Sequence, residues 1–153
     1  MENVQPNITI LSVNEVPDST VINRSALRRM GNQTVNVDLN VRVVPNIEKS
    51  IVSLVVSCSY LAQIGFLRYR ILVSSVVANF GVENLSKIVI PKGDENVIPS
   101  DIMMTMLGVA VGALRGVVAV RTQGTKLRNS PLPLIDLKTL IYRLHYGQTP
   151  VDR

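Results

Sequence analysis

Two side chains in this chain of 153 residues are of the types that usually carry nucleophilic or acid–base catalysis, and each stands alone. His145 is the only histidine and Cys58 the only cysteine. His145 lies between Tyr142 and Tyr146, where no neighbouring acid could orient it as a general base. Cys58 alternates with apolar residues, which is typical of a small buried side chain and not of an exposed, reactive thiol.

Patterns that need several residues are absent as well. The sequence has no HxxxH or CxxC spacing and no paired carboxylates. Gly108 and Gly112 are not followed by a Lys-Ser or Lys-Thr pair, so they do not form a phosphate-binding loop. The sequence therefore predicts a protein that is not an enzyme and that needs no metal and no cofactor.

Composition indicates one domain, residues 1–153, with an aliphatic core. Hydrophobic residues make up 46% of the chain, aromatic residues only 4%, and tryptophan is absent. The chain is long enough to bury a real core, and its Val and Ile content favours strands. A single cysteine allows no internal disulfide, and the start MENVQPNITI has no basic segment typical of a secretory signal. We therefore expect a cytoplasmic protein.

Four segments have strand character: 8–16, 34–43, 50–60 and 66–77. In 34–43 the alternation is almost perfect, which predicts an inward set (Val35, Val37, Leu39, Val41, Val43) and a more exposed set (Asn36, Asp38, Asn40, Arg42). In 66–77 it predicts Leu67, Tyr69, Ile71 and Val73 inward and Arg68, Arg70 and Ser74 outward. Segment 19–32 is expected to be a loop or an irregular edge, 91–99 a surface loop, and 82–90 a short helix or an extended lead-in.

Two helices are expected after the strands. The first, 101–120, is nearly uncharged and carries Gly108, Gly112 and Gly116 four residues apart, hence on one face. Such a stripe lets another backbone approach closely, either the sheet of its own fold or a second subunit. Its length also fits a membrane span, but Arg115 and the amphipathic strands favour a helix packed on a sheet. The second helix is short and amphipathic.

Strands first and helices last predict an α+β fold: a four-stranded antiparallel sheet with a long and a short C-terminal helix packed on one face. Charge is uneven along this order. The net charge is +5, and no acid lies between Asp101 and Asp136. Arg115, Arg121, Lys126 and Arg128 form a basic cluster there, which either complements the C-terminus of the long helix or attracts an anionic partner.

Two stretches carry a family resemblance. KSIVSLVVSCSYLAQIGFLRYRILVSSVV resembles the third and fourth strands of the SecB family of protein-export chaperones. LGVAVGALRGVVAVRTQGTKLRNSPLPLIDLKTLI resembles the long helix, the loop and the last helix of the same family, with Gly124, residues 131–135 and Asp136-Leu137 matching its glycine, its proline-leucine loop and the start of its final helix. The resemblance runs from about Asn7 to Leu144.

The resemblance implies a homotetramer, a dimer of dimers, that holds unfolded polypeptides in apolar grooves without nucleotide. Gly108, Gly112 and Gly116 would then lie at a subunit interface. The groove residues that it implies come from the sheet, the loop and the last helix: Tyr60, Phe66, Leu127, Leu132, Leu134, Ile135, Leu140 and Leu144. For Leu140 and Leu144, ordinary core packing is an equal alternative.

Two departures from the family's pattern leave its motor docking open. Export members are acidic on the exposed sheet face, where this chain has Arg42, Arg68 and Arg70, and they carry a longer tail after the last helix. A holdase for one dedicated partner, such as an antitoxin, is therefore an alternative to a link with a translocation motor. The rival class is a non-enzymatic assembly module with the same fold. We expect no nucleic acid partner and no stable membrane insertion; binding to either through the basic cluster is the weakest alternative.

Overall fold

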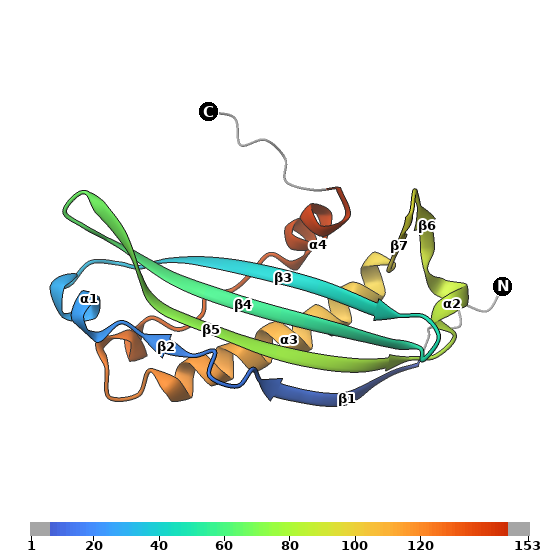
Figure 1. The fold of residues 1–153 in the computed structure, drawn as a ribbon, viewed down its shortest axis with the longest axis horizontal. Coiled ribbons are helices and arrows are strands. Elements are labelled where there is room, and N and C mark those ends of the chain that lie inside the picture. The colour runs from blue at the N-terminus through green and yellow to red at the C-terminus, as the bar shows by residue number, and fades with distance from the viewer. Residues whose placement is uncertain (1–6, 147–153) are drawn as a thin grey trace.

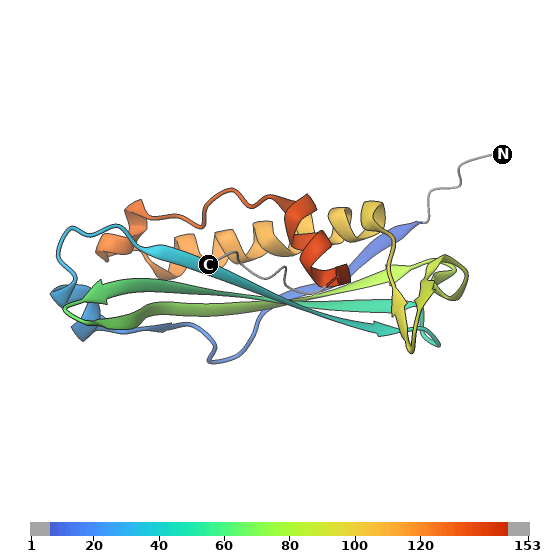
Figure 2. The same ribbon diagram turned by 90° about the horizontal axis from the view of Figure 1, so that it is seen from above.

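The computed structural model describes residues 7–146, which form one long, twisted antiparallel sheet with helices on one face (Figures 1 and 2). The strand order is β1-β5-β4-β3, and β2 also pairs with β5. The strands are β1 (Ile8–Glu15), β2 (Val21–Ile22), β3 (Asn36–Asn46), β4 (Ile51–Ile64) and β5 (Leu67–Val82). β1 and β2 share one edge of the sheet, and β3 forms the other edge.

The helices are α1 (Arg24–Arg29), α2 (Leu85–Ile88), α3 (Ser100–Arg121), the 3-10 helix η1 (Lys126–Asn129) and α4 (Leu137–Tyr146). A small hairpin, β6 (Ile90–Lys92) and β7 (Glu95–Val97), precedes α3. Figure 2 shows α3, α4 and the segment between them on the same side of the sheet. The predicted α+β class, with its antiparallel sheet and C-terminal helices, is confirmed.

The sheet has five strands, however, and of the two options for segment 19–32 the irregular edge is the one that the structure supports in part. The segment contains β2 and then α1. Asn23 is the N-cap of α1, because its side-chain Oδ1 accepts a hydrogen bond from the backbone N–H of Ala26 at 3.0 Å. Ala26, Leu27 and Met30 are buried, so this short helix closes one end of the core. Tertiary packing, and not helix length, holds such a short helix together.

The alternation predicted for 34–43 is confirmed. Val37, Leu39, Val41 and Val43 point toward the helices and are buried or half-buried, whereas Asn36, Asp38, Asn40 and Arg42 are exposed. The same period continues in β4, where Val52, Leu54, Val56, Cys58 and Tyr60 are all buried.

The prediction for β5 is wrong at Leu67, which is 61% exposed beside the β4–β5 turn, and again beyond Ile71, because the strand contains a β-bulge. Tyr60 pairs with Leu72 while Leu61 pairs with Arg70, so Ile71 is an extra residue in the ladder. Ile71 and Leu72 are both fully buried, and from there the inward positions are the even ones. Ser74 therefore points inward and is 1% exposed, and Val73 lies on the opposite face.

The predicted surface loop 91–99 is the β6–β7 hairpin with Gly93 and Asp94 at its turn. Gly93 has φ 61°, in the left-handed region that glycine adopts at little cost. α2 confirms the helical option for 82–90.

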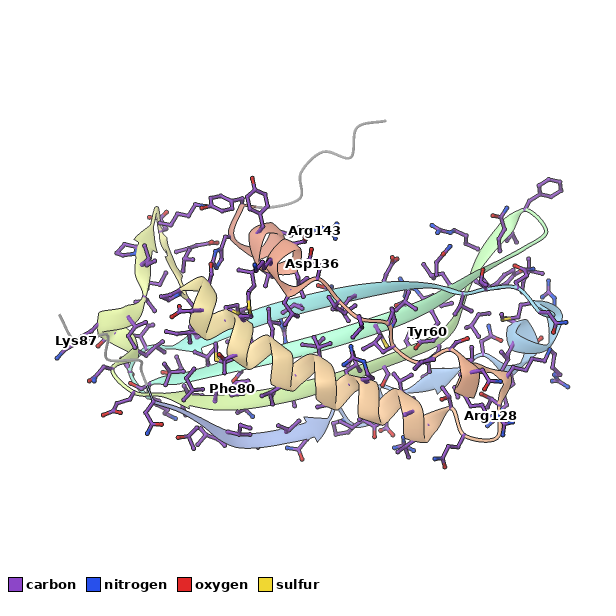
Figure 3. All side chains as sticks on the ribbon, turned by 180° about the vertical axis from the view of Figure 1, so that it is seen from behind. Tyr60, Phe80, Lys87, Arg128, Asp136 and Arg143 are labelled. Carbon is purple, nitrogen blue, oxygen red and sulfur yellow. The ribbon has the colours of Figure 1, made fainter. Side chains whose placement is uncertain are left out.

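α3 packs one face on the sheet. Its buried residues recur at helical spacing: Ile102, Met103, Met106, Leu107, Ala110, Val111, Leu114 and Val118. With Tyr60 and Phe80, both fully buried (Figure 3), they form the centre of the core. By length and composition α3 could cross a membrane, with a mean hydropathy of 1.9, but 44% of that window is buried within the described fold.

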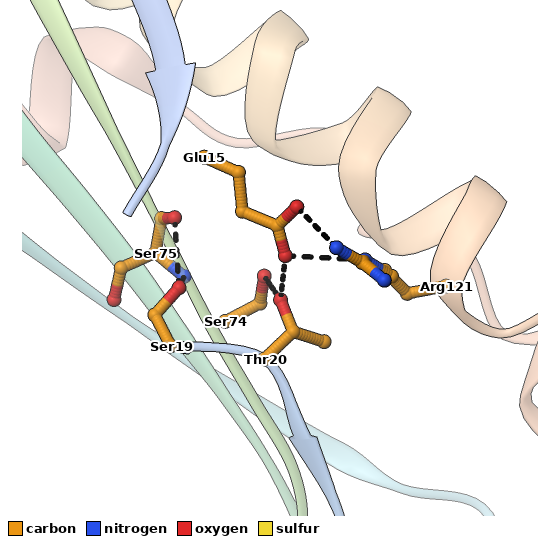
Figure 4. A network of polar contacts seen from close by, with 6 residues as sticks. All are labelled: Glu15, Ser19, Thr20, Ser74, Ser75 and Arg121. Carbon is orange, nitrogen blue, oxygen red and sulfur yellow. Dashed lines mark hydrogen bonds and ion pairs between the residues drawn. The ribbon is translucent and has the colours of Figure 1, made fainter. Parts of the chain in front are cut away.

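A polar network joins the C-terminus of α3 to the sheet (Figure 4). The Arg121 guanidinium donates two hydrogen bonds to Glu15, at 3.2 Å to Oε1 and 2.8 Å to Oε2. Thr20 donates to Glu15 Oε1 and shares a 2.8 Å hydrogen bond with Ser74 Oγ. The hydrogen bonds from Arg121 and Thr20 lower the pKa of Glu15. The inward turn of Ser74 at the bulge thus supplies one polar partner of a network that ties β1, β2 and α3 together.

Candidate functional site: a groove along the edge strand β3

The outer edge of β3 carries unpaired backbone groups, which the hydrogen-bond pattern identifies. The N–H of Val82 donates to the carbonyl of Ser50, so even-numbered residues of β4 bond to β5 and odd-numbered ones to β3. Asn36 pairs with Leu61 and Arg42 with Val55, so the even residues of β3 bond inward. The backbone groups of Val37, Leu39, Val41 and Val43 therefore point away from the sheet. Pro45, which lacks an N–H, continues this outward series, as expected for a proline in an edge strand.

Two open pockets follow this edge, one after the other. The first, here called the α4 pocket, has a volume of about 660 Å³ and lies between β3 and the start of α4. Its lining is Val37, Asp38, Leu39, Asn40, Leu134, Ile135, Asp136, Thr139, Leu140 and Arg143. Apolar side chains of β3 and α4 face each other across it, while Asp136 and Arg143 supply charge on the α4 side; Figure 3 shows Arg143 on α4 and Asp136 just before this helix.

The second, the hairpin pocket, has a volume of about 550 Å³ and continues along β3 toward its end. Its lining is Val41, Arg42, Val43, Pro45, Ile47, Glu95, Asn96, Val97, Ile98, Met103, Leu144 and His145. Together the two pockets form a groove, the β3 groove, whose floor is a strand edge. Each pocket's volume lies in the range of pockets that bind ligands. The lining of the hairpin pocket is mainly apolar, whereas half of the residues that line the α4 pocket are polar or charged.

Three sets of hydrogen bonds position the wall opposite β3. Arg115 of α3 donates to the carbonyls of Leu132 and Pro133, both at 3.0 Å. Asp136 caps α4, since its Oδ1 accepts from the backbone N–H groups of Lys138 and Thr139. These bonds, with that from the Thr139 hydroxyl, lower the pKa of Asp136. The loop between α3 and α4 is thereby held in one path that presents Leu134 at the surface.

The far end of the groove is closed by contacts between α4 and the β6–β7 hairpin. Lys92 Nζ donates to the carbonyl of His145 and lies 4.1 Å from the centre of the Tyr146 ring. Tyr146 stacks on Tyr142 with ring centres 4.8 Å apart. A cation above an aromatic face is attracted by the ring's quadrupole, so this cluster fastens the hairpin to the helix. These are exposed contacts at the end of the described chain; the tail beyond Tyr146 lies outside the described residues.

Four of the eight predicted client-binding residues line the β3 groove. Leu134, Ile135 and Leu140 line the α4 pocket, and Leu144 lines the hairpin pocket. Leu134 is 94% exposed, which is unusual for a leucine in a structured loop. Leu140 and Leu144 are half-buried, so each packs partly against the core and partly lines a pocket.

The other four residues are elsewhere. Tyr60, Leu127 and Leu132 belong to the core, with 0%, 2% and 2% exposure, so the expectation that they line a surface groove is wrong. Tyr60 donates from its hydroxyl to the carbonyl of Ser130 at 2.8 Å, and burial raises its pKa to about 12. Its role is to anchor the loop. Phe66 is fully exposed at the tip of the β4–β5 hairpin, away from the groove.

Sequence reasoning missed the edge strand as the floor of the groove and the residues of the hairpin pocket. The alternation in 34–43 identified Val37, Leu39, Val41 and Val43 as inward, but the predicted strand ended before Pro45, whose missing N–H is the one sequence signal of an edge strand. Val97, Ile98 and Met103 come from the hairpin and the start of α3, and only the tertiary structure brings them beside β3.

The two chemically reactive side chains lie apart, Cys58 in the core and His145 at the end of α4. Within residues 7–146, no cluster of His, Cys, Asp and Glu could hold a metal ion. His145 Nε2 is buried without a hydrogen-bond partner among the described residues. Burial raises the pKa of Cys58 to about 11, so its thiol stays protonated at neutral pH.

We expect the Cys58 thiol to be protected from modification in the folded protein. A thiol-specific reagent at about pH 8 should react at a rate set by unfolding, since the side chain is 2% exposed and its thiolate is disfavoured. In denaturant the reaction should be immediate. The measurement is the rate of colour release with a disulfide reagent; rapid, stoichiometric labelling without denaturant would contradict the burial of Cys58.

Gly108, Gly112 and Gly116 lie on the face of α3 opposite the buried one, and all three are exposed. A Cβ built on any of them meets no atom within 4 Å. Of the two expected covers for the stripe, the protein's own sheet is therefore excluded. Within the described chain, the outer face of α3 is a smooth, uncharged surface that also includes Thr105 and Ala119.

The basic cluster does not act as one unit. Arg115 is half-buried and holds the loop, and Arg121 forms an ion pair with Glu15. Lys126 and Arg128 remain as exposed cations on η1. Of the four cations, Arg121 lies in the last turn of α3, where a positive charge interacts favourably with the C-terminal end of the helix dipole.

Comparison with known proteins gives fold similarity only. No protein-family model and no curated protein matches the sequence. A SecB-like chaperone of Mycobacterium tuberculosis, solved in complex with a peptide from an antitoxin, aligns over 84% of this chain and 86% of its own, with 15% identity and a TM-score of 0.46. A protein of unknown function from Streptococcus agalactiae aligns over 86% of this chain and 98% of its own, with 10% identity and a TM-score of 0.44. Neither alignment assigns a family or a function to this chain, so its function has to be inferred from the β3 groove.

Proposed function

We propose that this protein is an ATP-independent chaperone, a holdase, that binds extended segments of unfolded or partly folded polypeptides in the β3 groove. One observation carries the proposal. The outward backbone groups of Val37, Leu39, Val41 and Val43 face the same groove into which their side chains, and those of Leu134 and Leu140, project. A polypeptide could therefore satisfy its backbone and bury its apolar side chains in one place.

An extended client would add a strand to the sheet. Its N–H and C=O groups would pair with the free edge of β3, and alternate side chains would enter the two pockets. Backbone pairing is independent of client sequence, so affinity comes from the strand edge and modest selectivity from the pockets. Eleven residues of β3 offer an edge long enough for a segment of several residues.

Edge strands of this length are normally protected against pairing with other chains. In β3 the features that protect against such pairing are few: Pro45 near the end of the strand, and the charged Asp38 and Arg42 on the face away from the helices. The apolar side chains beside the edge of β3 favour the binding of another chain and do not prevent it. A protein that keeps such an edge open has a use for it, and transient capture of other chains is the use that the lining favours.

The proposal also includes a homo-oligomer, a dimer of dimers, in which Gly108, Gly112 and Gly116 lie at a subunit interface. Support comes from the smooth outer face of α3, where nothing in the described chain covers an apolar helix. We further propose that the protein works in the cytoplasm, as a non-enzyme, on export clients or on one dedicated partner such as an antitoxin. The alternative is an assembly module that uses the same groove for one folded partner.

The holdase proposal predicts that the purified protein suppresses aggregation of an unrelated unfolded polypeptide at near-stoichiometric ratios and without ATP. Light scattering of a denatured enzyme diluted into buffer measures this. Because affinity comes from apolar burial, at about 25 cal/mol per Å² before ordering costs, suppression should change little when salt is raised. Binding through exposed cations would instead weaken steeply with salt.

A peptide with alternate N-methyl groups provides a sharper control. A bound peptide should lose affinity when the methylated nitrogens are those that face β3, and keep it when methylation is shifted by one residue, because only every second N–H pairs with the edge. Equal binding of both methylated peptides would exclude strand addition. Failure to suppress any aggregation, together with tight binding of one folded partner, would favour the assembly module.

A further inference from the structure

The hairpin that joins β4 and β5 projects beyond the rest of the sheet (Figure 1). β3 pairs with β4 only as far as Leu61, and β2 pairs with β5 only as far as Leu72. Past Leu61 the two strands pair with each other alone, ending in the Ile64–Leu67 pair. Gly65 has φ 62° at the first turn position, as in a type II′ turn. The free part of β4 is residues 62–64, three residues or about 10 Å at strand geometry, and they pair with residues 67–69 of β5.

The tip of this hairpin is apolar and fully accessible. Phe66 is 103% exposed and Leu67 is 61% exposed. Neither side chain contributes to the core, and Phe66 costs solubility without contributing to the stability of the described fold. Phe66 does not line the β3 groove. Client binding in that groove therefore does not explain why an aromatic side chain is exposed at the end of this two-stranded ribbon.

Cationic side chains surround this tip. Arg68 and Arg70 are exposed on the stem of the hairpin, and the short helix α1 beside the stem exposes Arg24, Arg28 and Arg29. The Arg29 guanidinium lies 5.1 Å from the centre of the Tyr69 ring, which fixes α1 against the stem. Lys126 and Arg128 of η1 belong to the same end of the molecule, where Figure 3 shows Arg128. We call these seven cations and the tip the basic end.

No carboxylate of the contributing segments offsets this charge. The sequence has no acid between Asp18 and Asp38, between Glu48 and Glu83, or between Asp101 and Asp136. Among residues 7–146 the one ion pair joins Arg121 to Glu15, so the seven cations are not paired with carboxylates. The other nine Lys and Arg residues of the chain are outnumbered by its eleven acids. The positive charge of the protein is thus concentrated at one end.

We propose that the basic end docks on an anionic membrane surface, with Phe66 and Leu67 inserted among the lipid headgroups and the surrounding arginines on lipid phosphates and carboxylates. This function is separate from client binding in the β3 groove and leaves the groove free. The protein would bind peripherally, with no helix crossing the bilayer.

The shape and chemistry of the tip favour a lipid surface over nucleic acid. Phe66 and Leu67 occupy adjacent positions at a convex tip, and the leucine offers nothing for a base to stack on or to hydrogen-bond. Apolar side chains that enter the headgroup region beneath a ring of Lys and Arg are the usual form of peripheral membrane attachment. The two contributions add, because each cation near an anionic leaflet strengthens binding by about fivefold.

The test is sedimentation of the full chain with vesicles at about 0.1 M salt. We expect binding to vesicles of equal parts phosphatidylcholine and phosphatidylserine, and none to phosphatidylcholine alone. Phe66→Ser should weaken binding by about tenfold or more, the loss of one buried aromatic side chain. Arg68→Gln with Arg70→Gln should weaken it by at least tenfold. All these positions are exposed, so thermal melting should be unchanged.

Insertion itself can be followed by fluorescence, because the chain has no tryptophan. Phe66→Trp introduces one reporter at the tip, and its emission should shift to the blue with anionic vesicles. Leu134→Trp in the α4 pocket is the matched control and should not shift. An unshifted Phe66→Trp in protein that sediments would place the contact elsewhere and overturn the proposal.

Lys49→Gln with Lys87→Gln removes two exposed cations outside the basic end; Figure 3 shows Lys87 at the opposite end of the molecule. This double variant should bind vesicles like the parent. Equal weakening by both double variants would mean that net charge alone is responsible, and the proposal would fail. Binding of a short labelled RNA without any binding to anionic vesicles would overturn it in favour of nucleic acid. Aggregation suppression, measured in parallel, reports on the β3 groove independently.

Discussion

Replacing Leu132 by alanine is expected to lower the free energy of unfolding by about 2–5 kcal/mol, whereas Leu134→Ser should leave it within about 0.5 kcal/mol. Leu132 is 2% exposed and Leu134 is 94% exposed, although they are two residues apart in the same loop. Removing buried methyl groups leaves a cavity, while an exposed leucine has few contacts to lose. Denaturant unfolding followed by circular dichroism measures both values.

The same two positions should respond in the opposite order when peptide binding is measured. Leu134→Ser should weaken binding of an extended apolar peptide by about tenfold, because one side chain worth about 1.5–3 kcal/mol leaves the α4 pocket. Val44→Ser is the matched control, since Val44 is 47% exposed on the same strand β3 but on its other face. Peptide affinity that drops equally in both variants would contradict the position of the groove. Stability that falls as much for Leu134→Ser as for Leu132→Ala would contradict the path of the loop.

Replacing Gly112 by leucine should dissociate the proposed oligomer without unfolding the subunit. A Cβ at Gly112 meets nothing within 4 Å, so the chain's own fold accepts the side chain. Within a subunit, the change should even stabilise α3, because glycine is about 1 kcal/mol less favourable than alanine in a helix and leucine is close to alanine. In an interface built on close helix approach, the same side chain would force the subunits apart.

Light scattering of the parent and the Gly112→Leu variant measures the mass, and thermal melting measures the fold. A smaller mass with a retained or higher melting temperature is the expected result. Thr105→Ser, on the same exposed face of α3, removes only a methyl group and serves as the control. A parent protein that is already monomeric, or a variant of unchanged mass, would remove the glycine stripe from any interface.

The loop between α3 and α4 shows how an apolar sequence divides into core and surface. Leu127, Leu132 and Leu134 are the same residue type in similar surroundings, and they were all expected at the rim of a groove. Arg115 pins the carbonyls of Leu132 and Pro133, and Tyr60 pins that of Ser130. These three bonds determine which leucines turn inward. The donors of these bonds, Tyr60 and Arg115, are distant from the loop in sequence, so the local sequence pattern of the loop cannot predict the bonds.

The sequence by itself determined the parts of this protein that depend on local periodicity. It specified the four long strands, the inward set of β3, the amphipathic α4 and the long α3, because side-chain period follows from backbone geometry. The tertiary structure decided the rest. One extra residue at Ile71 reversed the faces of β5, since a bulge shifts every later side chain by one position. Strand order placed β3 at an edge and brought α4 and the β6–β7 hairpin beside it. The β3 groove exists only through that pairing order, because an edge depends on which neighbour a strand lacks. Pro45 is compatible with an edge, but no residue of β3 determines that α4 and the β6–β7 hairpin lie beside it.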